Sequence, residues 1–321
     1  MKKTTRTLLG IGGAFCLIGA LLFGIGFMSG GTKYVHATNL NSMNAQEDNK
    51  ESANRFTLKK TEIPDFTSLN INLEDSDLNI EESPNEKSYI EYAQATKDKK
   101  NPVSYSIENG TLTLKEAGNT GASYYINVDI SFLQAALSSK NIEDYTKESS
   151  KYENYVTLYL PKDKLVSSAK IYLGYGDFYV KNAAFDTINI KLDDGDFDAN
   201  TLTANSGKLT FSYGDCDLQK ASLGNISLTS KDGDLTVNEL TLSGKTKIAL
   251  SYGDAEITLN DSTKKVSGFD LATHYGTITA SGLNGNKTVD EDDDVNTFQS
   301  DSKDGKTKLA IDSKDGDITV K

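Results

Sequence analysis

Several residue types are scarce in this chain of 321 residues: it has no tryptophan, two histidines and two cysteines. So few soft ligands exclude most zinc, haem and iron–sulfur centres. Positive charge is also in the minority, because 34 Lys and Arg stand against 46 Asp and Glu, a formal charge of −12. Nucleic-acid binding needs clustered Lys and Arg, so we exclude nucleic acid as a partner.

The first 30 residues predict a cytoplasmic start and one membrane-spanning helix. Three basic residues precede an uncharged run from Leu8 to Met28, which would span about 31 Å as a helix and match a hydrocarbon core of roughly 30 Å. The basic residues favour a cytoplasmic N-terminus, so we expect the remaining chain outside the cytoplasm. The alternative is a signal peptide cleaved after Ala37, which would release the chain as a secreted protein.

Small residues recur every four positions in this apolar run, at Gly12, Cys16, Ala20 and Gly24. On a helix they would form one stripe and let a second membrane helix approach closely. The alternative is that they reflect only the glycine content that is common in membrane helices. With Cys16 in the membrane and Cys216 outside it, the two cysteines cannot form a disulfide.

A Gly-Asp pair recurs through the C-terminal half of the chain. The pairs begin at Gly176, Gly195, Gly214, Gly233, Gly253 and Gly316, with Gly276-Thr277 as a degenerate copy. The spacings are 19, 19, 19, 20, 23 and 40 residues, and we interpret the longest as two periods with one copy lost in an insertion. Short runs of alternating apolar residues flank the pairs, which is the pattern of β-strands.

A unit of 19–20 residues cannot bury its own apolar face, but stacked copies can. We therefore predict an all-β fold, a parallel β-solenoid of roughly 19–20-residue rungs with strands about 4.8 Å apart, preceded by the transmembrane helix. Glycine suits the turn because it accepts positive φ, and aspartate bonds nearby backbone amides. Stacking would align the aspartates in a column, and tyrosine would interrupt a second acidic column just before the glycines.

The chain divides into four expected segments: the anchor at 1–30, a flexible linker at 31–55, an N-terminal β region at 56–160 that caps the solenoid, and the repeat solenoid at 161–321. An insertion at 281–306 contains five consecutive acids at 290–294, which is typical of a solvated loop. Since the chain ends directly after the last repeat strand, we expect that rung to be terminal. The insertion would then either cap its edge or leave the edge to a partner strand.

The anchor, the linker, the Tyr-Leu-Pro-Lys-Asp stretch at 159–163 and the repeated Gly-Asp-aliphatic rungs together resemble a bacterial family. It is the domain-of-unknown-function family labelled "putative adhesin", built from β-strand repeats, and the resemblance covers about residues 56–321. The resemblance implies a bacterial envelope protein, with related domains in proteins of the Gram-positive envelope-stress response. It implies no catalytic residues and no particular ligand.

Aspartates at alternate positions beside two of the turns are candidate calcium ligands, because Ca²⁺ takes carboxylate oxygens. They are Asp194, Asp196, Asp198, Asp215 and Asp217. The alternative is that these are turn acids bonded to amides and water, in which case the protein holds no cofactor.

Tyrosines occupy the position before four of the turn glycines, at Tyr175, Tyr213, Tyr252 and Tyr275. Such a column could stack on sugars or on a protein partner. Alternatively, the rings shield the glycine turns and pack against their neighbours. Cys216 takes an inward-facing position in its strand, so we expect a small buried core residue there.

We expect no enzymatic activity, because the chain has neither a Gly-x-Ser-x-Gly elbow nor a phosphate-binding loop. The predicted function is that of an extracytoplasmic binding or scaffolding module in the bacterial envelope, tied to envelope-stress signalling. Its expected partner is an envelope protein or a polysaccharide. The alternative is a cell-surface adhesin that binds glycan or a host protein.

Overall fold

The computed structural model describes residues 55–95, 101–117, 154–290 and 294–321. These residues belong to one compact unit made of 52–118 and 151–321. The predicted membrane helix, its stripe of Gly12, Cys16, Ala20 and Gly24, the cleavage position after Ala37 and most of the linker lie outside the described residues. Within the described ranges, no helix has both the length and the apolar character needed to cross a membrane.

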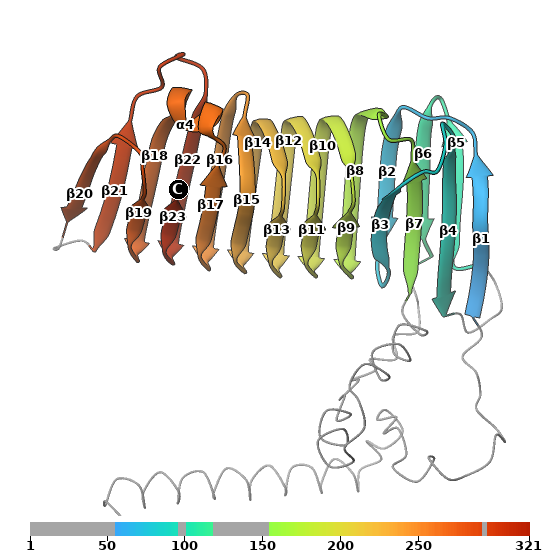
Figure 1. Cartoon of the computed structure of the whole chain (residues 1–321). Coiled ribbons are helices and arrows are strands. Elements are labelled where there is room, and N and C mark those ends of the chain that lie inside the picture. Colours follow the sequence, from blue (N-terminus) through green and yellow to red (C-terminus); the bar gives the residue numbers. More distant parts are fainter. Residues whose placement is uncertain (1–54, 96–100, 118–153, 291–293) are drawn as a thin grey trace, which may run out of the picture. The chain divides into compact units, whose positions relative to one another are not determined.

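The described chain is almost entirely β-strand (Figure 1). The N-terminal strands are β1 (Arg55–Ile63), β2 (Ser68–Leu73), β3 (Asp77–Glu82), β4 (Ser88–Ala95), β5 (Val103–Glu108), β6 (Thr111–Glu116) and β7 (Tyr155–Leu160). The repeat strands are β8 (Leu165–Tyr175), β9 (Phe178–Val180), β10 (Ala183–Asp194), β11 (Phe197–Ala199), β12 (Leu202–Tyr213), β13 (Cys216–Leu218), β14 (Ala221–Asp232), β15 (Leu235–Leu242), β16 (Lys245–Tyr252) and β17 (Ala255–Leu259). The C-terminal elements are α4 (Asp261–Val266), β18 (Gly268–Tyr275), β19 (Ile278–Ala280), β20 (Asn286–Asp290), β21 (Val295–Ser300), β22 (Lys308–Asp315) and β23 (Ile318–Val320).

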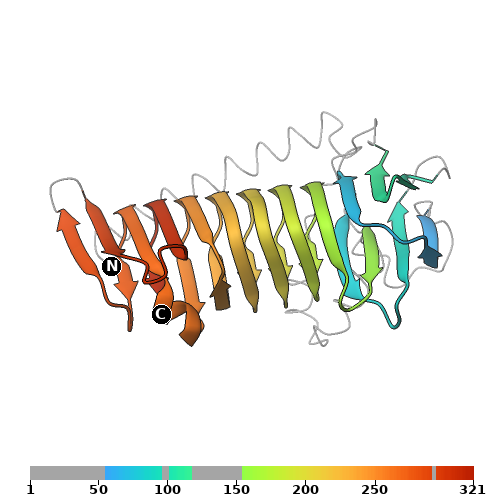
Figure 2. The same ribbon diagram turned by 90° about the horizontal axis from the view of Figure 1, so that it is seen from above.

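Each rung from β8 onward is a long strand, a Gly turn and a shorter strand, and every rung pairs in parallel with the next. The long strand β12, for example, pairs with β10 on one side and with β14 on the other, while the short strand β13 pairs with β11 and β15. Viewed from above, the rungs lie side by side in one row (Figure 2). The predicted parallel solenoid is therefore confirmed for the described residues.

The core lies inside the rungs because alternate residues of each strand point inward. Phe178 and Phe197 stack at a centroid distance of 5.0 Å, and Phe211 lies 5.9 Å from Phe197. Cys216 stands in register between Phe197 and Leu235 and is 2% exposed, as predicted for a core residue. Burial raises the pKa of its thiol, so it stays protonated at neutral pH.

The C-terminal rung is not terminal, which corrects the expectation drawn from the end of the chain. Strand β22 pairs in parallel with both β16 and β18, and β23 pairs with both β17 and β19. The chain therefore builds rung β18–β19 one position further out and then returns to fill the gap beside rung β16–β17 (Figure 1). Both edges of the last rung are hydrogen-bonded, and neither is left for a partner strand.

The acidic insertion is also different from the expected loop with a lost copy. It contains a hairpin in which β21 pairs antiparallel with β18 and β20 pairs antiparallel with β21. The hairpin covers rung β18–β19 rather than the last rung, and no further parallel rung exists among the described residues. Strand β20 is the outer edge, and all five of its residues are exposed.

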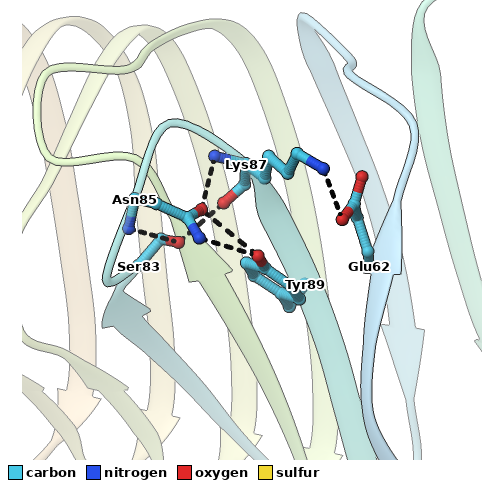
Figure 3. A network of polar contacts seen from close by, with 5 residues as sticks. All are labelled: Glu62, Ser83, Asn85, Lys87 and Tyr89. Atoms are coloured by element: carbon cyan, nitrogen blue, oxygen red, sulfur yellow. Dashed lines mark hydrogen bonds and ion pairs between the residues drawn. The ribbon is translucent and has the colours of Figure 1, made fainter.

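The N-terminal end mixes parallel and antiparallel pairing. Rung β2–β3 continues the parallel stack, since it pairs with β8 and β9 on one side and with β6 and β7 on the other. Strands β1, β4 and β5 then add antiparallel pairs. A polar network fixes the connection between β3 and β4: the Ser83 hydroxyl donates to the Lys87 carbonyl (2.6 Å), and Lys87 Nζ reaches Glu62 Oε2 at 2.8 Å (Figure 3).

Candidate functional site

The aspartates after the turn glycines, together with Asp77 after Ser76, form a continuous hydrogen-bonded column, here called the Asp ladder. Its members are Asp77, Asp177, Asp196, Asp215, Asp234, Asp254 and Asp317. In each step one carboxylate Oδ1 accepts the backbone N–H of the aspartate in the next rung, at 2.8–2.9 Å. Every turn therefore has its amide satisfied by its neighbour, which supports the interpretation of these residues as turn acids.

The ladder ends where the stack ends. The N–H of Thr277 donates to Asp317 Oδ1 at 2.7 Å, and on this side β19 pairs with β23 alone. An aspartate at this position would have no further turn amide to accept. The degenerate Gly276-Thr277 copy therefore sits at the end of the column in space, although it precedes Gly316-Asp317 in the sequence.

The residues before the turn glycines, together with Asp75 before Ser76, form a second column, here called the Tyr-Asp ridge. In spatial order its members are Asp75, Tyr175, Asp194, Tyr213, Asp232, Tyr252, Asp315 and Tyr275. Tyrosine and aspartate alternate at every step. In the sequence this regularity is hidden, because Tyr275 follows Tyr252 directly among the repeats; the insertion of β22 places Asp315 between them.

The four ridge tyrosines are exposed to solvent. The exposed fractions are 61% for Tyr175, 56% for Tyr213, 60% for Tyr252 and 65% for Tyr275. Two rungs separate neighbouring rings, about 9.6 Å, and none of the four forms a ring contact or a side-chain hydrogen bond with another described residue. Mutual stacking therefore does not explain them, and their rings and hydroxyls are available to a partner.

The five candidate calcium ligands do not converge on one point. Asp194 belongs to the Tyr-Asp ridge, and Asp196 and Asp215 belong to the Asp ladder. Asp198 and Asp217 lie opposite each other on the outer side of β11 and β13. Among the described residues no group of three or more His, Cys, Asp or Glu is arranged to hold a metal ion.

Burial and like charges both act on Asp198. Burial raises the pKa of Asp198, and the neighbouring Asp217 raises it further. The charged form of Asp198 is therefore disfavoured in the folded protein, and its position opposite Asp217 is an electrostatic cost.

Positive charge gathers elsewhere, on the outer face of the long strands. A shallow hollow of about 580 Å³ there is lined by Lys115, Lys170, Lys191 and Lys208, and no carboxylate lines it. Lysines therefore gather on this part of the long strands, whereas the two turn columns carry carboxylates.

A family model matches residues 66–321, which include all eight rungs, both turn columns and the terminal hairpin. The chain belongs to the Toastrack DUF4097 family. The family match confirms the resemblance drawn from the repeats to a bacterial family of domains of unknown function.

Three solved structures are similar to this Toastrack chain. A protein from Clostridium sporogenes that is labelled "putative cell adhesion protein" is 12% identical, with a TM-score of 0.30, covering 82% of this chain and 99% of that chain. A "putative adhesin" from Bacteroides fragilis is 10% identical, with a TM-score of 0.39, covering 83% and 97%. A "putative adhesin" from Parabacteroides distasonis is 11% identical, with a TM-score of 0.36, covering 84% and 98%. No curated protein matches the chain.

The sequence does not reveal one side chain that binds the backbone of the first turn. Glu116 lies at the end of β6, which pairs with β2 on the side away from the repeat. Its Oε2 accepts hydrogen bonds from the backbone N–H groups of Glu74 (2.8 Å) and Asp75 (3.0 Å). Gln94 Nε2 also donates to this carboxylate. Burial raises the pKa of Glu116. Because Glu116 lies outside the repeat, no periodic pattern in the sequence indicates its role.

Proposed function

We propose that this chain is a non-enzymatic binding and scaffolding module of the bacterial cell envelope. In this proposal the N-terminal segment anchors it in the plasma membrane and the solenoid faces outward, where it takes part in envelope-stress signalling. Membership of the Toastrack DUF4097 family supports a binding module at the cell surface. The Tyr-Asp ridge is the observation that carries the proposal.

The ridge supports binding because it presents solvent-exposed aromatic rings at a fixed interval on a rigid scaffold. Aromatic rings with a polar tip are enriched at protein interfaces, since they bury much apolar area and lose little conformational entropy. A folded domain has no packing need for four tyrosines that are more than half exposed. The backbone of each turn is held by the Asp ladder, so the rings stand on fixed positions.

The test is crosslinking of the tagged full-length chain in its native membrane, followed by identification of the crosslinked partner. We expect a specific envelope protein or polysaccharide, and we expect its yield to fall strongly when Tyr213 and Tyr252 are both changed to Ser. Tyr179→Ser is the matched control, because Tyr179 lies on the outer side of β9, away from the ridge, and accepts a hydrogen bond from Asn200.

A second pair of changes separates the anchor from the ridge. Gly12→Leu with Gly24→Leu should disrupt a partner that packs in the membrane and leave a partner of the ridge untouched. Equal yields from the wild-type chain and the Tyr213/Tyr252 variant would overturn a binding role for the ridge. Capture of material from a foreign surface instead of the envelope would favour an adhesin.

A further inference from the structure

We propose that the Tyr-Asp ridge binds a proline-rich polypeptide segment that carries lysine or arginine and adopts the polyproline II conformation. The inference deepens the proposed function and rests on it. Three properties of the ridge support this class of partner: its period, its charge and the state of its backbone amides.

The period of the ridge matches the pitch of polyproline II. Like residues of the ridge recur every two rungs, or about 9.6 Å. A polyproline II helix has three residues per turn and rises about 3.1 Å per residue, so its pitch is about 9.3 Å. Every third residue of such a segment could therefore meet one tyrosine after another, and the mismatch accumulates to only about 1 Å from Tyr175 to Tyr275.

The charge of the ridge favours a cationic segment. The ridge contributes four carboxylates, at Asp75, Asp194, Asp232 and Asp315, and the adjoining Asp ladder contributes seven more. The column on the other side of the ridge contains Glu74, Asp193, Lys231 and Lys314. Carboxylates thus strongly outnumber lysines along the whole length. An acidic or neutral polymer would gain nothing from the aspartates between the rings.

Basic side chains fit the alternation itself. If one proline of each helical turn packs on a tyrosine, the side chains of the other two residues point sideways. A lysine or arginine at one of these two positions can reach the aspartate between two rings. The same cation can lie over a tyrosine face, where the negative face of the ring attracts it. Aromatic grooves that dock proline-rich segments use this combination of flat rings and preformed helix.

The backbone of the turns excludes the main competing mode, in which a partner adds a β-strand. Strand addition needs unpaired backbone N–H and C=O groups. Along the ladder each aspartate N–H from Asp177 to Asp317 already donates to a carboxylate of the preceding rung. Recognition at the ridge must therefore use side chains. A polyproline II segment suits recognition by side chains, because its backbone carbonyl groups are solvated and can accept hydrogen bonds from the tyrosine hydroxyls.

The experiment measures binding of a peptide of Pro-Pro-Lys repeats, about fifteen residues long, to the purified full chain in detergent. Two peptides serve as controls: Pro-Pro-Glu repeats, which keep the conformation and reverse the charge, and a permuted peptide with the same composition but no three-residue period. We expect the Pro-Pro-Lys peptide to bind about tenfold tighter than either control, a difference of roughly 1.4 kcal/mol.

Variants of the chain locate the binding. The double change Tyr213→Ser and Tyr252→Ser should lower the affinity for the Pro-Pro-Lys peptide about tenfold, and Tyr179→Ser should leave this affinity unchanged. Asp232→Asn should lower the affinity for this peptide less, and it should make the affinity less sensitive to salt because one charge pair is lost. All of these side chains are surface groups, and far-ultraviolet circular dichroism checks that the variants fold.

Each other outcome overturns the proposal. If the permuted peptide bound as tightly as the Pro-Pro-Lys peptide, binding would depend on charge attraction and not on the match between the two periods. Tighter binding of a chitosan oligomer, a cationic polysaccharide offered in parallel, would assign the ridge to glycans. If no peptide binds while the Tyr213/Tyr252 variant still loses its envelope partner by crosslinking, the ridge is a binding site of another class and the proposed function stands.

Discussion

The repeat strands β8–β17 and the N-terminal strands β1–β7 bury the same kind of aliphatic core, but they satisfy their turns differently. In the repeat, one device serves every rung, because each ladder aspartate bonds the amide of the next. At the N-terminal end each turn has its own solution, such as Glu116 for the first turn or the Ser83–Lys87 network for the next connection. Periodicity spreads the turn interactions over many equal contacts, whereas the cap concentrates them in single side chains.

The largest effect should come from a glycine turn in the middle of the repeat, where neighbouring rungs approach closely. Gly214 has φ +118°, and a Cβ there would overlap the carbonyl oxygen of Gly195 in the preceding rung. Gly214→Ala should lower the free energy of unfolding by roughly 3–5 kcal/mol, through strain and displacement of the neighbouring turn. Urea unfolding followed by circular dichroism measures it.

The matched control for this change is Gly282→Ala. Gly282 also has positive φ, at +71°, but nothing lies within 4 Å of the position that a Cβ would take there. The change should cost only about 1 kcal/mol. Equal costs at the two glycines would show that stacking of the turns adds nothing to the backbone strain.

The cap should be the next most sensitive place. Glu116→Ala removes the acceptor of two backbone N–H groups at a partly buried position and should cost about 2 kcal/mol. Glu116→Gln keeps an acceptor oxygen and should cost much less. If both variants unfold alike, the carboxylate charge rather than its hydrogen bonds holds the first turn.

The same residue predicts a pH dependence. Burial raises the pKa of Glu116 above its ordinary value of 4.5, so the folded protein keeps this proton to a higher pH than the unfolded chain does. The contribution of Glu116 to stability is therefore highest below pH 4.5 and falls as the pH rises through the folded pKa. Comparing Glu116→Gln with the wild type across this range should show the fall in the wild type alone.

One ladder position should matter less than the cap, because the ladder repeats. Asp215→Ala removes one acceptor, that of the Asp234 N–H, and should cost about 1 kcal/mol, since the exposed amide can turn to water. Thr277→Asp is the complementary change at the end of the column and should have almost no effect. A large loss from Thr277→Asp would mean that the terminal turn needs its neutral side chain.

The smallest expected effect is a gain in stability. Asp198 and Asp217 are like charges directly opposite each other, an arrangement that costs a few tenths of a kcal/mol or more. Asp198→Asn should therefore raise the free energy of unfolding by about 0.5 kcal/mol at neutral pH. The gain should shrink in acid, where the wild-type carboxyl takes up its proton. Asp163→Asn, in the turn before β8, serves as the neutral control.

Much of the fold could be predicted because the signals are local and repeated. Alternation such as Ile171 and Leu173, followed by Gly176-Asp177, predicts a strand and a turn, and the regular spacing predicts parallel stacking. The column of aspartates and the column of tyrosines followed from the same spacing. The position of the last rung did not, because a strand next to the chain end can pair with any free edge of matching register.

The sequence by itself determined the rung: its length, its inward residues and its Gly-Asp turn, since these depend on local conformation and on the apolar alternation. Tertiary structure alone decided the order of the rungs, because strands can pair through backbone hydrogen bonds whatever their separation along the chain. Strand β22 fills the gap between β16 and β18, where it finds hydrogen-bond partners on both sides. That placement sets Asp315 between Tyr252 and Tyr275, and it completes the alternation of the Tyr-Asp ridge.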